Sequence, residues 1–133
     1  MTASAEAPQP QMSKIQRGIA LVVDDNTDTA RVLELMVQTL GFETHLAEDG
    51  VDALRKANEF QPNVVLLDLT MPKLDGYDVC RVIRAQPWAA KVRIVAVTGR
   101  QKEEVESKSQ ETGFDGYLLK PVGFSTLEEI LTA

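Results

Sequence analysis

The sequence predicts a single α/β domain in which a parallel β-sheet carries helices on both of its faces. Short apolar runs, typical of strands buried on both faces, alternate along the chain with segments whose apolar residues repeat at helical spacing. Strand-like runs and helical segments each occur five times. This alternation favours parallel strands joined by right-handed crossovers, and a length of 133 residues suits one domain.

Four of the five predicted strands are largely apolar, and the fifth is mixed. The apolar runs are "IALVV" (19–23), "VVLL" (64–67), "RIVAV" (93–97) and "GYLL" (116–119), and the mixed run is "ETHLA" (43–47). Apolar strands belong at the centre of a parallel sheet, where helices cover both faces. We therefore expect the mixed run to form an edge strand.

Apolar residues at helical spacing mark four of the five predicted helices. Their stripes are Ala30, Leu33, Val37 and Leu40, closed by Gly41; Val51, Leu54 and Ala57; Val79, Val82 and Ile83; and Leu127, Ile130 and Leu131. The remaining segment, 101–113, contains Val105 as its only large apolar residue. A helix with one apolar anchor is expected to be the most loosely packed of the domain.

The composition excludes several classes of protein. A net charge of −6 argues against binding to nucleic acid or to an anionic membrane. The single cysteine, Cys80, excludes an internal disulfide and favours a reducing compartment. No apolar run approaches the roughly 20 residues of a membrane span. We therefore expect a cytoplasmic protein or domain without membrane insertion.

The first 17 residues differ in composition from the rest of the chain. They contain two prolines and many small or polar residues, a composition typical of linkers. The sequence thus predicts a flexible tail or linker at 1–17 and a folded domain at 18–133. Whether the tail is a native leader or the end of a linker stays open.

Polar residues stand where four of the predicted strands end. Asp24 and Asp25 follow the first strand, Asp68 the third, Thr98 the fourth and Lys120 the fifth. In open α/β sheets, ligands bind at the carboxyl ends of the strands. Three converging carboxylates repel one another unless a cation lies between them, and oxygen ligands without His or Cys suit Mg²⁺. These residues predict a Mg²⁺-dependent phosphoryl site in which one aspartate is the nucleophile.

Four motifs at these strand ends together resemble the receiver domain of two-component response regulators. They are "VVDDN" (22–26), "LLDLTMPKLDGY" (66–77), "VTG" (97–99) and "GYLLKPV" (116–122). Each is weak alone, but the ordered set is specific. The resemblance covers about residues 18–133. It implies a doubly wound, flavodoxin-like sheet of strand order 2-1-3-4-5 with five helices, and a signalling module rather than a dedicated enzyme.

The resemblance also implies a role for each residue of the predicted site. Asp68 matches the phosphoacceptor, which takes a phosphoryl group from a phosphohistidine of a partner protein. Asp24, Asp25 and Asp68, with the backbone carbonyl of Thr70, match the Mg²⁺ ligands. Thr70 and Arg100 occupy two positions that tune the lifetime of the phosphoryl group.

A second group of residues matches the receiver's phosphoryl contacts and its switch. Thr98 and Lys120 match the residues that contact the phosphoryl oxygens. Tyr117 matches the aromatic residue whose rotamer couples to the threonine, so Thr98 and Tyr117 are the implied switch. A half-buried packing role is the alternative for Tyr117. The bond between Lys120 and Pro121 is implied to be cis.

The implied partner is a histidine kinase or a histidine phosphotransfer protein, and no nucleic-acid contact is expected from this domain. The chain is expected to be a free-standing receiver or the receiver of a hybrid histidine kinase. A competing function is that of a phosphatase-type enzyme using an aspartyl-phosphate, although Thr70 stands where such enzymes have a second aspartate. Two further candidate functions are those of a flavodoxin-like cofactor carrier and of a receiver-shaped binding module that is never phosphorylated.

Several residues have simpler structural interpretations. Asp25 or Asn26 is able to cap the first helix. His45 is expected at the surface of the edge strand and Cys80 in the core. Trp88 is expected to anchor a loop by packing.

Overall fold

The computed structural model describes residues 17–69, 71, 75–99 and 112–132. Five parallel strands form one sheet in the order β2-β1-β3-β4-β5. They are β1 (Gly18–Val23), β2 (Phe42–Ala47), β3 (Val64–Asp68), β4 (Arg93–Thr98) and β5 (Gly116–Leu119). The predicted fold class and strand order are confirmed, and the mixed run forms β2 at the edge of the sheet.

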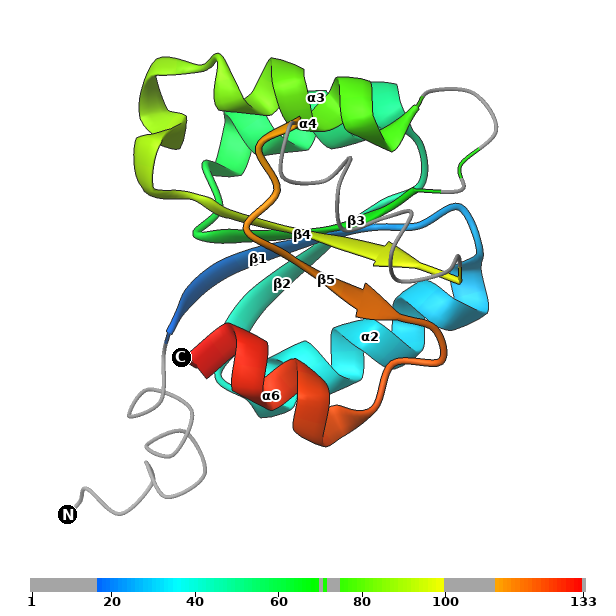
Figure 1. The fold of residues 1–133 in the computed structure, drawn as a ribbon. Helices are drawn as coiled ribbons and strands as arrows, with labels where there is room; N and C mark the ends of the chain where they lie inside the picture. The colour runs from blue at the N-terminus through cyan, green and yellow to red at the C-terminus, as the bar shows by residue number, and fades with distance from the viewer. Residues whose placement is uncertain (1–16, 70, 72–74, 100–111, 133) are drawn as a thin grey trace, which may run out of the picture.

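Helices cover both faces of the sheet (Figure 1). Helices α2 (Thr27–Thr39) and α6 (Phe124–Thr132) lie on one face, and α3 (Gly50–Phe60) and α4 (Gly76–Arg84) lie on the other. A short 3₁₀ helix, η2 (Pro87–Lys91), follows α4. The predicted helix at 101–113 falls almost wholly outside the described residues. No helix in the described part of the chain has the length and apolar character needed to cross a bilayer.

Two apolar layers hold the helices to the sheet. Neighbouring side chains of a strand point to opposite faces, so Val65 and Leu67 of β3 join the layer under α3 and α4, whereas Leu66 joins the layer under α2 and α6. All three are essentially inaccessible to water. Packing on both faces therefore fixes the end of β3 and positions Asp68, its last residue.

Two residues predicted to lie on apolar helix stripes instead face solvent. Val51 is 75% exposed and Val82 is 44% exposed, so the prediction was wrong for both. In α3 the buried side chains are the small Ala53 and Ala57, and Val51, two residues before Ala53, falls on the opposite side of the helix. In α4 the buried face is formed by Val79, Cys80 and Ile83, and Val82 lies beside it.

Three single residues can be compared with their predicted placements in the core, on a loop and at the surface. Cys80 lies in the core as predicted, and its burial raises the pKa of the thiol to about 11. Trp88 packs against the core and donates to the Asn58 Oδ1 atom at 3.1 Å, which confirms its anchoring role. His45 is not a simple surface residue, because its ring stacks on Phe60 with the ring centroids 3.7 Å apart.

Arg84, at the end of α4, joins three segments. Its Nη1 atom donates to the carbonyl oxygens of Val92 at 2.7 Å and Ala89 at 3.2 Å. Its Nε and Nη2 atoms donate to the Gly113 carbonyl at 3.1 and 3.0 Å, and Nη2 also bonds Asp115 Oδ2 at 2.5 Å. Gly113 has a φ of +112°, which L side chains rarely adopt. Arg84 therefore fixes the approach to both β4 and β5.

The amino ends of the strands form the edge of the sheet at which the described chain begins and ends. Arg17 and Thr132 line the same polar depression of about 300 Å³. Arg17 Nε donates to the Leu40 carbonyl at 2.7 Å, and Arg93 Nη1 donates to the Ile130 carbonyl at 2.5 Å. These arginines satisfy carbonyls near the carboxyl ends of α2 and α6, where a positive charge is favourable.

Candidate functional site

Three carboxylates meet at the carboxyl edge of the sheet. Val23 of β1 pairs with Leu67 of β3, which places Asp24 beside Asp68. Asp24 and Asp68 are 3% and 2% exposed, whereas Asp25 is exposed. One oxygen from each of the three carboxylates lies within 4.8 Å of the others. The structure thus brings together the three aspartates that the sequence singled out.

Helix capping accounts for Asn26 and not for the acids beside it. Asn26 Oδ1 accepts a hydrogen bond from the Thr29 N–H at 3.0 Å and forms the N-cap of α2. The Asn26 N–H donates to Asp24 Oδ1 at 2.9 Å. The turn from β1 into α2 therefore orients one oxygen of Asp24, and Asp25 is not the cap.

Lys120 reaches the carboxylates from the far side of β4. Its N–H donates to the Thr98 carbonyl at 2.8 Å, just beyond the last residue of β5. Its Nζ atom lies 3.3 Å from Asp68 Oδ2 and 3.6 Å from Asp24 Oδ2. The bond to Pro121 is cis, as predicted, and Thr98 is fully buried at the end of β4.

The surroundings of Asp24 raise the pKa of its carboxyl group. Burial is the largest cause, and the negative charge of Asp68 adds to it. The Asn26 N–H and the Lys120 ammonium act in the opposite direction, but the pKa stays above its ordinary value. In the described part of the chain, Asp24 Oδ2 is buried and accepts no hydrogen bond. Counting only the described residues, the site holds three carboxylates and one ammonium, so negative charge is in excess.

The donor set fits a Mg²⁺ ion. Among the described residues the candidate ligands are carboxylate oxygens, which hard divalent cations prefer. The buried Asp24 Oδ2 atom lacks a hydrogen bond, and a cation bound there would satisfy it. A divalent charge would also relieve the repulsion among Asp24, Asp25 and Asp68.

The close approach of the start of α4 to the end of β3 accounts for one glycine next to the site. A Cβ atom on Gly76 would lie 2.9 Å from the Asp68 carbonyl oxygen, closer than real Cβ atoms approach. Asp75 caps α4 through a 2.8 Å bond from the Tyr77 N–H to its Oδ1 atom. The pair Asp75-Gly76 thus allows α4 to begin in direct contact with the end of β3.

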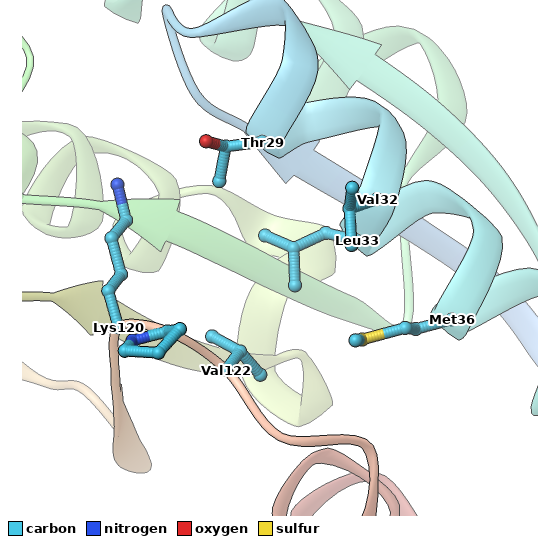
Figure 2. Close-up of a pocket in the computed structure, with 7 residues that line it drawn as sticks. Thr29, Val32, Leu33, Met36, Lys120 and Val122 are labelled. Atoms are coloured by element: carbon cyan, nitrogen blue, oxygen red, sulfur yellow. The ribbon is translucent and has the colours of Figure 1, made fainter.

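An apolar pocket of about 430 Å³ adjoins the site (Figure 2). It is lined by Thr29, Val32, Leu33, Met36, Lys120, Pro121 and Val122. Lys120 belongs both to this pocket and to the carboxylate site. The pocket was not predicted, because only one apolar stripe was expected on the first helix. The signal was present, since Thr29, Val32, Leu33 and Met36 follow helical spacing.

The remaining predicted residues are placed only in part. Tyr117 is half-buried and packs against the apolar layer under α3 and α4. It pairs with Ala96 in β4, two residues before Thr98. Thr70 and Arg100 lie outside the described residues.

The sequence and the fold are similar to those of known proteins. The family model described as the response regulator receiver domain matches residues 20–132. The DNA-binding response regulator MtrA of Mycolicibacterium paratuberculosis is 40% identical over 101 residues, which are 76% of this chain and 44% of that protein. The chain therefore spans less than half the length of this curated relative.

Two solved structures are similar throughout the fold. The chemotaxis protein CheY4 of Vibrio cholerae superimposes with a TM-score of 0.81 at 28% identity, covering 86% of this chain and 95% of that chain. The receiver domain of the sensor histidine kinase PA1611 of Pseudomonas aeruginosa gives 0.78 at 34% identity, covering 86% and 94%, and holds a magnesium ion in its active-site cleft. With the family model matching nearly all of residues 18–133, the chain belongs to the response regulator receiver domain family, whose members act in two-component and phosphorelay signalling.

Proposed function

We propose that residues 18–133 form a receiver that is phosphorylated on Asp68 by a phosphohistidine of a partner protein, with residues 1–17 as its tail or linker. One observation carries the proposal. The oxygens of Asp24, Asp25 and Asp68 lie within 4.8 Å of one another, and Lys120 Nζ lies 3.3 Å from Asp68 Oδ2. This arrangement surrounds one buried carboxylate with the groups that phosphoryl transfer requires.

In the proposed reaction a carboxylate oxygen of Asp68 attacks the phosphorus of the phosphohistidine. A P–O bond forms, the P–N bond breaks, and its electron pair stays on the imidazole of the partner. The Lys120 ammonium and the Thr98 hydroxyl bind the phosphoryl oxygens. Mg²⁺, when bound, supplies the charge neutralisation that phosphoryl transfer depends on. The residues that would hold it are Asp24, Asp25 and Asp68, with the backbone carbonyl of Thr70.

The response to phosphorylation is proposed to pass through Thr98 and Tyr117. Once Asp68 carries the phosphoryl group, the Thr98 hydroxyl turns toward it and Tyr117 fills the space that is vacated. Thr98 is fully buried and Tyr117 is half-buried on the neighbouring strand, which supports a switch between two packed arrangements. Thr70 and Arg100 are proposed to tune how long the phosphoryl group survives hydrolysis.

The proposed partner is a histidine kinase or a histidine phosphotransfer protein. The pocket beside Lys120 supports this, because it offers apolar contacts next to the phosphoacceptor, and Val32 at its rim is 53% exposed. A helix of the partner carrying the phosphohistidine would pack against this pocket. The receiver is proposed to act in the cytoplasm as a signalling module that turns over only its own phosphoryl group.

The proposal is tested by the intact mass of the protein after incubation with acetyl phosphate, with Mg²⁺ or with a chelator. We expect one added phosphoryl group with Mg²⁺, which hydroxylamine removes because it cleaves acyl phosphates. An absence of adduct together with an absence of phosphate release would contradict the proposal and favour a binding module that is never phosphorylated. Steady phosphate release without an adduct would indicate rapid turnover at the same site.

Docking at the pocket is tested by Val32→Lys. We expect this change to slow phosphoryl transfer from a phosphohistidine protein roughly tenfold or more, because a buried unpaired ammonium opposes docking. Uptake from acetyl phosphate is expected to stay unchanged, since the small donor needs no docking surface. The matched control is Leu35→Lys on the same helix, at a residue that is 66% exposed and does not line the pocket. Equal slowing in both variants would contradict a specific role for the pocket.

A further inference from the structure

Asp115, the residue before β5, makes a two-way contact with Ile94 of β4. The Asp115 N–H donates to the Ile94 carbonyl at 2.7 Å, and the Ile94 N–H donates to Asp115 Oδ2 at 2.8 Å. Asp115 thus uses its backbone and its side chain to satisfy both backbone groups of Ile94. This two-way contact fits the register in which Val95 pairs with Gly116.

Arg84, at the end of α4, contacts the same carboxylate of Asp115. Its Nη2 atom lies 2.5 Å from Asp115 Oδ2, the same oxygen that accepts the Ile94 N–H. The guanidinium also binds the Gly113 carbonyl twice and the Val92 carbonyl once. The planar guanidinium therefore fixes Asp115 relative to Val92, which precedes β4, and Gly113, which comes before β5.

The register between β4 and β5 determines where Lys120 lies. Strand β5 has only four residues, from Gly116 to Leu119, and Lys120 follows it directly. A slip of one residue would shift Lys120 by about 3.3 Å along the strand and turn its side chain to the other face of the sheet. That shift is as large as the 3.3 Å distance that now joins Lys120 Nζ to Asp68 Oδ2.

We propose that Arg84 and Asp115 are positioning residues for Lys120, acting at the opposite end of β5 through the β4–β5 register. The effect on phosphoryl transfer rests on the proposed function, but the placement of the ammonium beside the carboxylates does not. With Lys120 displaced, the site loses a cation that contacts the phosphoryl group. It also loses the positive charge that competes with a metal ion for Asp24 and Asp68.

If Arg84 and Asp115 position Lys120, their variants change the phosphorylation rate and the Mg²⁺ affinity in a combination that loss of stability does not produce. The reference variant is Lys120→Met, for which we expect slower phosphorylation by acetyl phosphate and roughly fivefold tighter Mg²⁺ binding, because a repelling charge is removed. Asp115→Ala is expected to change both quantities in the same directions. A misplaced charged group costs about tenfold to a hundredfold in rate.

The experiment measures Mg²⁺ affinity by calorimetry and the phosphorylation rate by intact mass, on the full chain well below its melting temperature. Asp115→Asn and Arg84→Lys serve as milder variants if Asp115→Ala does not fold. The matched control is Arg81→Ala, which removes an arginine of α4 whose partner, Asp78, is exposed and lies on the same helix. We expect Arg81→Ala to leave both quantities unchanged.

Unchanged Mg²⁺ affinity in folded Asp115→Ala, alongside tighter binding in Lys120→Met, would overturn the proposal. Weaker Mg²⁺ binding in Asp115→Ala would also overturn it, because general disorder of the site has that effect. If the wild-type protein takes up no phosphoryl group, the proposed function fails while the Mg²⁺ measurements still test the positioning of Lys120.

Discussion

Replacing Asp68 with Asn is expected to abolish phosphoryl uptake and to raise the melting temperature of the Mg²⁺-free protein. The amide is a poor nucleophile, so the adduct is lost completely. Asn keeps the shape of the side chain but removes one of two buried carboxylates that share a single ammonium. The repulsion that helps to raise the pKa of Asp24 disappears with it. We expect a gain of about 1–2 kcal/mol in the free energy of unfolding.

The measurement is intact mass together with thermal unfolding, with and without Mg²⁺. Mg²⁺ should stabilise the wild-type protein more than the variant, because ligand binding to the folded state adds to its stability. Asp75→Asn is the matched control, since Asn caps a helix as well as Asp does and Asp75 is not in the carboxylate cluster. An adduct on the Asp68 variant, or a lower melting temperature, would count against this account of the site.

Leu33→Ala is expected to lower the free energy of unfolding by about 2–5 kcal/mol, because it removes a buried isopropyl group and leaves a cavity. Leu33 is 3% exposed and belongs to the apolar layer under α2 and α6. Chemical denaturation monitored by circular dichroism measures the loss. A domain of this size has only about 5–15 kcal/mol to lose.

Leu35→Ala provides the comparison two residues further along α2. The chemical change is identical, but Leu35 is 66% exposed. We expect a change within about 0.5 kcal/mol, as for most surface substitutions. Similar losses for the two variants would mean that Leu33 does not pack between α2 and the sheet.

The sheet was predictable because its strands are buried on both faces. A run such as Val64–Leu67 has no polar residue, and such runs suit the centre of a parallel sheet. The helices were less predictable in detail. In α3 the contact with the sheet is made by Ala53 and Ala57, and small residues give a weak signal compared with an exposed residue such as Val51. Tertiary packing decides which of these apolar residues is buried.

The two buried carboxylates of the site were predictable because Asp24 directly follows β1 and Asp68 ends β3. Parallel strands deliver the residues at their carboxyl ends to one edge, so Asp24, Asp68 and Lys120 had to meet if the sheet formed. The Arg84–Asp115 pair had no comparable signal. Its members are separated by 31 positions in the chain, and their contact depends on how α4 packs beside β4 and β5. Local sequence patterns carry no information on such a contact.

The positions of Arg17 and Thr132 bear on how such a module is used in longer chains. Both line one depression at the amino ends of the strands, and the carboxylates lie at the opposite ends of the strands. The described chain therefore enters the domain at Arg17 and ends at Thr132 on the same side of the molecule, away from Asp68. Entry and exit points this close allow a unit to be inserted, transplanted or permuted with little disturbance of its neighbours. The topology thus suits a domain that recombination or protein engineering can insert into a longer chain. The carboxylate site at the other edge of the sheet then stays accessible.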